Sequence, residues 1–183
     1  DLSKFQSTGQ ETCLHGRHLG AQIYADLNGR NWSIRDYEAR GGYQALRRIL
    51  TGNGGEPMTP EQVIAEVKLS GLRGRGGAGF PMGRKASFLP KDSPMPAYVV
   101  CNGDESEPVT FKDREILERN PFQLLEGMIL AGYAVGSHQT YVYIRGEYEH
   151  QARVLAAALA QARAAGYVGE RIAGSDFSCN ITI

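Results

Sequence analysis

Cysteine is scarce in this sequence of 183 residues, which contains only three. Cys13, Cys101 and Cys179 lie far apart, and an odd number of widely spaced cysteines fits neither a disulfide framework nor a cysteine-based metal site. The pattern favours a protein that works under reducing conditions, where free thiols persist.

Net charge and long hydrophobic runs are also lacking. The 20 Lys and Arg residues balance 20 Asp and Glu residues, so the chain as a whole has no preference for polyanions. The longest mostly apolar stretch, Leu124 to Val135, is too short to cross a bilayer and contains Glu126. No charged segment followed by an apolar one opens the sequence, as a secretory signal would. These absences predict a soluble protein.

Glycine, by contrast, is concentrated between Ser70 and Lys85, where six glycines accompany four basic residues. Ordering a glycine costs backbone entropy, so a dense cluster needs a structural reason. Without a Cβ, backbone N–H groups can approach an anion, and the turns open to glycine can direct several of them at one phosphate. Arg73, Arg75 and Arg84 add full charges. The stretch is a candidate phosphate-binding loop, with a flexible solvated loop as the alternative.

The context of these glycines excludes two familiar nucleotide-binding motifs. The dinucleotide fingerprint follows a strand and opens a helix, whereas here a helix comes first. Thr59 is a capping residue and Pro60 suits the first helical position. The helix then places apolar residues on one face, at Val63, Ile64, Val67 and Leu69. A Walker A loop is excluded because Lys85 is not followed by Ser or Thr.

Beyond residue 97, segments rich in β-formers alternate with helical segments. A helix is predicted from Gly41 to Leu50, before the glycine cluster. After it come strands at 97–102, 140–144 and 177–183, a helix that begins at Asn120-Pro121, and a helix over 153–165. This alternation implies right-handed crossovers and an α/β fold, with a mainly parallel sheet and flanking helices. Ligands of such folds bind at the C-terminal ends of the strands.

An acidic segment, Asn102-Gly103-Asp104-Glu105-Ser106-Glu107-Pro108, directly follows the first predicted strand. Three carboxylates within four residues repel one another unless they have partners. They form either a solvated acidic turn or part of a cleft. In the cleft they would accept hydrogen bonds from a ligand whose phosphates lie on the glycine loop. Spacing alone leaves both interpretations open.

Taken together, these motifs resemble one family. The resemblance is carried, in order, by Leu72 to Pro81, Asn102 to Pro108, Phe111 to Arg114 and Tyr143 to Tyr148. They are similar to the flavin- and NADH-binding subunit of respiratory complex I, the 51 kDa or F subunit. The same family includes the flavin subunits of NAD-linked hydrogenases and formate dehydrogenases. The match implies an N-terminal extension over residues 1–36 and a Rossmann-like FMN/NADH-binding domain over 37–183.

The resemblance also implies which residues bind the ligands. Contacts with the FMN phosphate and flavin fall to Gly74, Arg75, Gly76 and Lys85. Contacts with the ribityl chain and isoalloxazine ring fall to Asn102, Asp104, Glu105 and Ser106. The NADH side falls to Gly77, Ala78, Phe80, Lys85, Phe88 and Glu107. No side chain is expected to act as a general acid or base, because the cofactors carry the chemistry: a hydride passes from NADH to FMN, which passes electrons singly to iron–sulfur clusters.

The implied function is that of an NADH dehydrogenase flavoprotein subunit of NADH:quinone oxidoreductase, a translocase of the electron transport chain. Its partners would be other subunits of the hydrophilic arm, of the thioredoxin-like 24 kDa (E) type and the iron–sulfur G type. Its location would be the cytoplasmic side of the bacterial inner membrane, or the cytoplasm. A soluble hydrogenase or formate dehydrogenase subunit and an inactive fragment are the alternatives. A nucleic-acid partner is not expected, because the Arg73 to Gly77 motif occurs once, in a neutral chain.

The sequence departs from the family at Met82, Arg84, Ala86 and Val109, where Thr, Leu, Trp and Gly are usual. Val109 would restrict a turn that needs unusual dihedral angles. The family also continues past the last predicted strand into a loop that completes the flavin site. A four-cysteine motif for a 4Fe-4S cluster follows farther on. The sequence is therefore expected to be the N-terminal portion of such a subunit, incomplete at the C-terminus.

Overall fold

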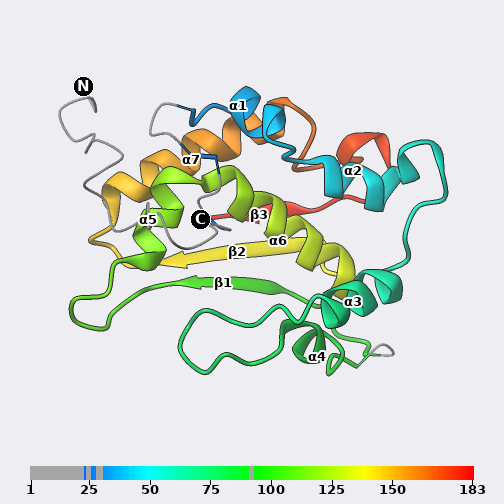
Figure 1. Cartoon of the computed structure of the whole chain (residues 1–183), viewed down its shortest axis with the longest axis horizontal. Helices are drawn as coiled ribbons and strands as arrows, with labels where there is room; N and C mark the ends of the chain where they lie inside the picture. Colours follow the sequence, from blue (N-terminus) through cyan, green and yellow to red (C-terminus); the bar gives the residue numbers. More distant parts are fainter. Residues whose placement is uncertain (1–22, 24–25, 28–30, 91–92) are drawn as a thin grey trace.

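The computed structural model of the chain describes residues 23, 26, 27, 31–90 and 93–183 (Figure 1). Its helices are α1 (Ile34–Ala39), α2 (Gln44–Thr51), α3 (Pro60–Leu69), α4 (Met82–Ala86), α5 (Lys112–Arg119), α6 (Pro121–Val135) and α7 (Glu149–Ala164), with 3₁₀ turns at Gly52–Gly54 and Ile172–Gly174. Its strands are β1 (Val99–Gly103), β2 (Gln139–Ile144) and β3 (Asn180–Thr182). Most of the predicted N-terminal extension, including Cys13, lies outside the described residues.

The strands form a parallel sheet in the order β1-β2-β3. The β1–β2 register runs from Val99 opposite Thr140 to Gly103 opposite Ile144. Helices α5 and α6 connect β1 to β2, and α7 connects β2 to β3. The prediction of an α/β fold with a mainly parallel sheet and flanking helices is therefore confirmed.

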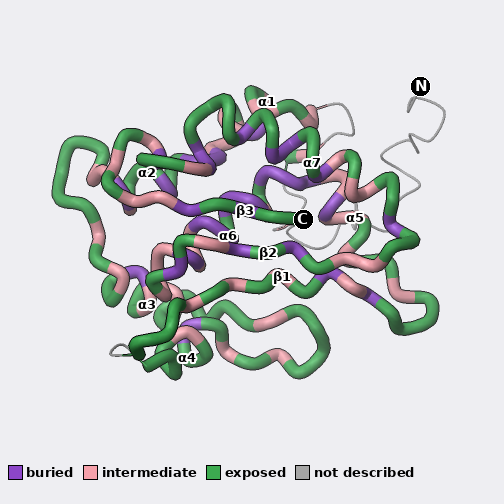
Figure 2. Tube along the Cα trace, turned by 180° about the vertical axis from the view of Figure 1, so that it is seen from behind, coloured by how far each residue is buried: buried purple, intermediate pink, exposed green. Residues whose placement is uncertain are grey.

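One face of the sheet carries the helices, and the core lies between the two layers. Helices α5, α6 and α7 pack against one another, and α6 packs on β1 and β2 (Figure 1). Leu125 and Ile129 of α6, Leu155 of α7, and Val142 and Ile181 of the sheet are buried there. Figure 2 shows the opposite face, where no helix lies in front of the strands. This face stays open because every crossover helix packs on the first.

Glu126 ties α2 and the region before it to α6. The carboxylate is buried and accepts hydrogen bonds from the Tyr37 hydroxyl (2.5 Å) and from the backbone N–H groups of Tyr43 (2.9 Å) and Leu46 (3.2 Å). The first N–H groups of a helix have no partner within the helix. Glu126 of α6 therefore caps the N-terminus of α2 from another part of the sequence.

Several elements differ from the sequence-based expectations. The helix predicted from Thr59 is present as α3, and Thr59 and Gln62 form a reciprocal capping box. Leu69, however, is 84% exposed, so its predicted place on the inner face is wrong; it lies at the last residue of the helix. Helices α1, α4 and α5 were not predicted, because each is short and buries a single residue. Within the described residues, no helix is long and apolar enough to span a bilayer.

Candidate functional site

The glycine cluster forms a hairpin, residues 73–81, between α3 and α4. An antiparallel bridge joins Arg73 to Pro81, and the Gly74 N–H donates to the Phe80 carbonyl (2.9 Å). The Arg73 guanidinium donates to the Gly79 carbonyl (3.0 Å), which further closes the loop. Helices α3 and α4 approach closely at Gly83, where a Cβ would lie 2.6 Å from the backbone nitrogen of Lys68. The hairpin is thus held at its base.

The tip of the glycine hairpin has unused hydrogen-bond donors. Among the described residues, the backbone N–H groups of residues 75–79 donate to no acceptor. Gly77 (φ +116°) and Gly79 (φ +61°) take conformations that L residues rarely adopt. Nothing lies within 4 Å of the position that a Cβ would take at Gly76, Gly77 or Gly79. A row of free N–H groups in open space is suited to hold an anion.

Two cations, Arg75 on the hairpin and Lys85 on α4, are free to contact a ligand. Arg75 and Lys85 are exposed, and neither side chain forms an ion pair or hydrogen bond with another described residue. Arg84 instead lies beside two exposed aromatic rings, with its guanidinium carbon 5.9 Å from the Phe80 centroid and 5.7 Å from that of Phe88. The donors and charges present fit a phosphate group.

The acidic segment forms a turn, residues 104–110, that begins where β1 ends. The Asn102 side-chain oxygen accepts from the Asp104 N–H (3.1 Å), and the Ser106 hydroxyl donates to the Asp104 carboxylate. Glu107 is exposed and has no ion pair among the described residues. Val109 has φ +66°, which confirms that the position requires an unusual dihedral angle. In the turn, Ser106 and Glu107 are exposed and Asp104 is partly exposed.

Glu105 behaves differently from its neighbours, because its carboxylate points inward and is fully buried. It accepts from the N–H groups of Asp113 (2.8 Å) and Arg114 (3.2 Å) at the start of α5 and from the Tyr148 hydroxyl (3.1 Å). Burial alone would raise the pKa of this carboxyl. The N–H donors, the hydroxyl and the nearby Lys112 ammonium outweigh burial and lower the pKa below its usual value. Glu105 is therefore charged at neutral pH.

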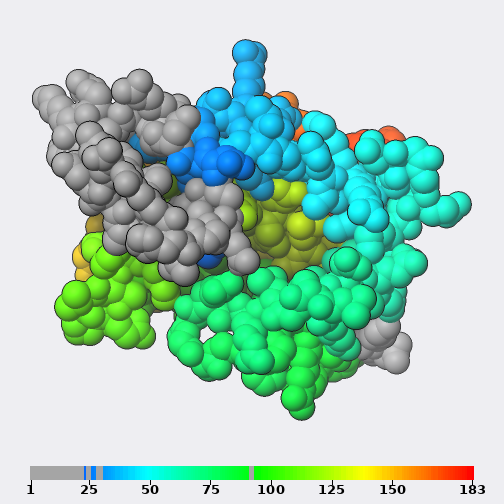
Figure 3. All heavy atoms as spheres, viewed as in Figure 1, coloured from blue at the N-terminus to red at the C-terminus, as the bar shows by residue number. Residues whose placement is uncertain are grey.

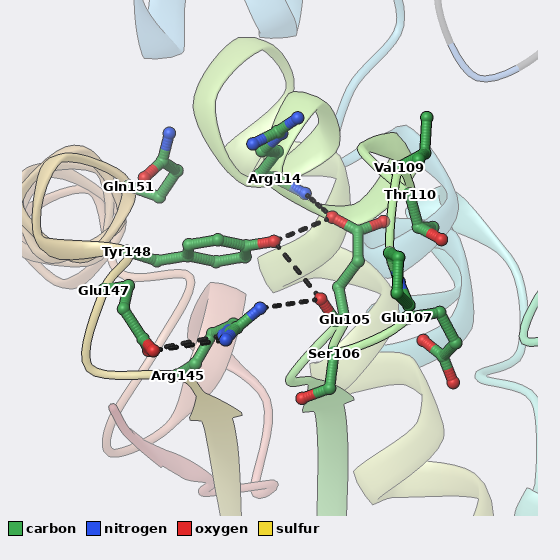
Figure 4. Close-up of a pocket in the computed structure, with 11 residues that line it drawn as sticks. Glu105, Ser106, Glu107, Val109, Thr110, Arg114, Arg145, Glu147, Tyr148 and Gln151 are labelled. Atoms are coloured by element: carbon green, nitrogen blue, oxygen red, sulfur yellow. Dashed lines mark hydrogen bonds and ion pairs between the residues drawn. The ribbon is translucent and has the colours of Figure 1, made fainter.

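A pocket of about 550 Å³ lies beside the acidic turn, where β1 and β2 end (Figure 4). The acidic turn forms one side, and Arg145 to Tyr148, which follow β2, form another. The Arg145 guanidinium is paired with Glu147 (3.1 Å) and donates to the Glu105 carbonyl (3.3 Å). Arg114 of α5 and Gln151 of α7 complete the lining. The pocket is polar and contains charges of both signs.

The predicted site residues fall into two groups. Gly74, Arg75, Gly76, Gly77, Ala78, Phe80, Lys85 and Phe88 lie on or just after the glycine hairpin, whereas Asn102, Asp104, Glu105, Ser106 and Glu107 lie at the end of β1. Only Glu105, Ser106 and Glu107 line the pocket. No hydrogen bond or ion pair between described residues joins the groups, although the hairpin extends along β1 toward its C-terminal end (Figure 1). Both lie at the surface in Figure 3.

Sequence reasoning assigned no role to Arg114, Arg145 or Tyr148, which line the pocket. A signal for two of them was present. The segment Arg145-Gly146-Glu147-Tyr148 follows the second predicted strand directly, and neighbouring parallel strands end at the same edge of a sheet. Arg114 gave no comparable signal, because α5 was not predicted.

Comparison with known families identifies the region that contains both groups. The family described as the Nuo51 FMN-binding domain matches residues 67–183. The chain is 52% identical over 150 residues to the F 2 subunit of NADH-quinone oxidoreductase of Rhizobium meliloti, covering 82% of this chain and 34% of that protein. It is 48% identical over 151 residues to the F subunit of the Aquifex aeolicus enzyme, with the same coverage. The chain thus spans about a third of the length of these relatives.

Solved structures of similar fold include NAD⁺-reducing NiFe-hydrogenase. In its air-oxidized state the match has a TM-score of 0.61 and 34% identity, and covers 82% of this chain and 24% of that one. In its H2-reduced state the TM-score is 0.58 with 37% identity, over 67% of this chain and 21% of that one.

Proposed function

The chain belongs to the Nuo51 FMN-binding domain family, and from this premise we propose that it binds FMN and NADH as part of an F subunit of NADH:quinone oxidoreductase. The observation that carries the proposal is the glycine hairpin, in which the N–H groups of residues 75–79 donate to no other described residue and the cations Arg75 and Lys85 pair with none. An anion there would meet directed donors and positive charge together. We also propose that residues 37–183 form the nucleotide-binding unit and residues 1–36 an extension.

The two groups of residues have complementary tasks in this proposal. Arg75, Gly76 and Lys85 hold the FMN phosphate, because they combine free N–H donors with charges, while Gly74, whose N–H is bonded to the Phe80 carbonyl, closes the base of the hairpin. Asn102, Asp104 and Ser106 accept or donate hydrogen bonds along the sugar chain and ring, with Glu105 fixing the turn from inside. Gly77, Ala78, Phe80, Phe88 and Glu107 face NADH, whose adenine ring finds two exposed aromatic side chains.

When bound, FMN would supply the redox chemistry, accepting a hydride from NADH and releasing electrons one at a time. The residues of this chain contribute binding and orientation. They hold two planar ligands at a fixed separation, which can supply about 7–11 kcal/mol of a barrier through positioning alone. No side chain needs to transfer a proton.

The relatives' names describe a subunit of a larger enzyme, and we propose that this chain likewise acts within such an assembly. Iron–sulfur subunits of the E and G types are the partners that would receive its electrons. The assembly would lie on the cytoplasmic side of the bacterial inner membrane. The hydrogenase likeness supports a second candidate, the flavin subunit of an NAD⁺-reducing hydrogenase. The higher identity to the quinone oxidoreductase relative, 52% against 37%, favours the first.

Titration of the purified chain with FMN, followed by flavin fluorescence, tests the proposal. We expect saturable binding, and we expect Arg75→Ala and Lys85→Ala each to weaken it by about tenfold or more, because a hydrogen bond to a charged group contributes about 1.5–3 kcal/mol. Arg48→Ala is the matched control, since it removes the same charge from an exposed position on α2. Absence of binding by the wild-type chain, or equal weakening by Arg48→Ala, would contradict the proposed site.

A further inference from the structure

Tyr148 lines the pocket beside the acidic turn, and its hydroxyl contacts Glu105, the residue that anchors that turn. Its ring is buried, with 8% exposed. Its hydroxyl lies 3.1 Å from the Glu105 carboxylate and 3.5 Å from the Glu105 carbonyl oxygen (Figure 4). We propose that Tyr148 is a positioning residue, which sets the conformation of the acidic turn and thereby the affinity of the chain for FMN. The inference rests on the proposed function.

The first support is the backbone of the turn itself. Glu105 has φ +47° and Val109 has φ +66°, so the turn is strained near both ends. Such conformations are unfavourable for residues other than glycine and persist when surrounding contacts hold them. For Glu105 those contacts are known. The carboxylate is anchored to the start of α5, and its carbonyl accepts from Arg145 (3.3 Å).

The second support is that the Tyr148 hydroxyl is the only side-chain hydroxyl among the described donors to this buried carboxylate. The other two donors are backbone N–H groups of α5. They fix Glu105 to the helix, whereas Tyr148 connects its carboxylate, and Arg145 its carbonyl, to the segment after β2. Burial and the bond to Glu105 raise the pKa of Tyr148, so the hydroxyl stays protonated and able to donate at neutral pH. Tyr148 therefore links the two strand ends that border the pocket.

The third support is the placement of the neighbours of Glu105. Asp104 and Ser106 are bonded to each other, and Glu107 follows them in the same turn. Ser106 and Glu107 are exposed and Asp104 is partly exposed, whereas the Glu105 carboxylate is buried. Any rotation of Glu105 would therefore move both of the neighbours that are proposed to contact the flavin.

The test compares Tyr148→Phe with Tyr141→Phe. Both remove one hydroxyl, but Tyr141 alternates with the buried Thr140 and Val142 of β2, lies on the open face of the sheet and is 40% exposed. Amide hydrogen exchange of the ligand-free chain is measured first. We expect Tyr148→Phe to accelerate exchange over residues 104–114, above all at the Asp113 and Arg114 amides, because their acceptor loses its third partner. We expect Tyr141→Phe to leave these residues unchanged.

FMN titration of the same variants is the second measurement. We expect Tyr148→Phe to weaken binding about tenfold, the effect of a hydrogen bond to a charged group. We expect the loss to shrink to near zero when Glu105→Gln is already present, because Tyr148 acts through that carboxylate. If Tyr148 only stabilised the fold, Tyr148→Phe would lower the melting temperature. Its effect on FMN affinity would then not depend on whether Glu105→Gln is present.

The outcomes separate the two proposals. Unchanged exchange in Tyr148→Phe overturns the positioning role, whatever the flavin affinity is. Faster exchange with wild-type FMN affinity overturns the claim that the placement of the turn controls binding. If the wild-type chain binds no FMN, the proposed function fails, and the exchange measurement still decides whether Tyr148 holds the turn.

Discussion

At the scale of single residues, the acidic turn contains a valine in a conformation that suits glycine. Val109 has φ +66° and is 92% exposed, so neither packing nor burial compensates the strain. In the left-handed region an L residue brings its Cβ too close to the following carbonyl oxygen, which costs roughly 1–2 kcal/mol. A β-branched side chain is among the least suited to it.

Replacing this valine with glycine is therefore expected to stabilise the chain. Val109→Gly removes the strain, and the greater freedom of glycine in the unfolded chain offsets part of the gain, about 0.5–1 kcal/mol. The expected net increase in the free energy of unfolding is about 0.5–1 kcal/mol, measured by urea denaturation. Val109→Ala keeps the Cβ and serves as the control, with a smaller gain. A less stable glycine variant would show that the turn is not strained at this residue.

At the scale of elements, two helices are capped by carboxylates from elsewhere in the sequence. Glu105 accepts from the first turn of α5, and Glu126 of α6 accepts from the start of α2. A negative charge at a helix N-terminus also interacts favourably with the helix dipole. Neither α2 nor α5 has a side-chain cap at the residue just before it, so Glu126, about 80 residues away, and Glu105, eight residues before Asp113, satisfy the donors that those cap positions leave free.

The cap from Glu126 can be tested through stability. Glu126→Ala leaves the Tyr43 and Leu46 N–H groups and the Tyr37 hydroxyl without their acceptor inside the core. Each unsatisfied buried group costs about 1–3 kcal/mol, so the expected loss is about 3 kcal/mol or more. Glu126→Gln keeps an acceptor oxygen and is expected to lose less. Urea denaturation measures both.

The control for this prediction is Glu149→Ala. It removes a glutamate from an exposed pair with Arg153 at i,i+4 spacing, which contributes only about 0.5 kcal/mol or less. Equal losses from Glu126→Ala and Glu149→Ala would mean that the buried carboxylate contributes no more than a surface charge.

At the scale of the whole molecule, the sheet is covered on one face and open on the other. Parallel sheets usually have both faces covered and consist of apolar residues throughout. In this chain, residues of β1 and β2 alternate between the buried helical side and the open side, where Val100 is 60% and Tyr143 61% exposed. The open face therefore contributes far less to stability than the covered face.

A pair of identical substitutions measures this difference. Val142 is 4% exposed on the covered face, and Val100 lies on the open one. Val142→Thr buries a hydroxyl that has no hydrogen-bond partner prepared for it. The expected cost is about 1–3 kcal/mol of unfolding free energy. Val100→Thr leaves its hydroxyl in water and is expected to change stability by less than about 0.5 kcal/mol. Similar costs at both positions, measured by urea denaturation, would show that the faces are equally buried.

The sequence by itself determined the fold class and the most regular elements. Alternating apolar segments predicted β1, β2 and β3 and the helices α6 and α7, because burial on a sheet or helix face leaves a periodic pattern. Thr59 and Pro60 predicted the start of α3, because capping is a local interaction. The family resemblance placed the candidate residues in two segments. Both segments lie within residues 67–183, the region that matches the Nuo51 FMN-binding domain family.

Only the tertiary structure decided how those segments are held. Glu105 was expected to act as its acidic neighbours do, but its side chain turns inward to α5 and Tyr148. Glu126 stood in an apolar run with no sign that it caps α2. The contacts of Glu105 with Tyr148 and of Glu126 with α2 join residues about 40 to 80 positions apart. Local periodicity carries no information about partners at that distance, because they meet only after the helices pack on the sheet.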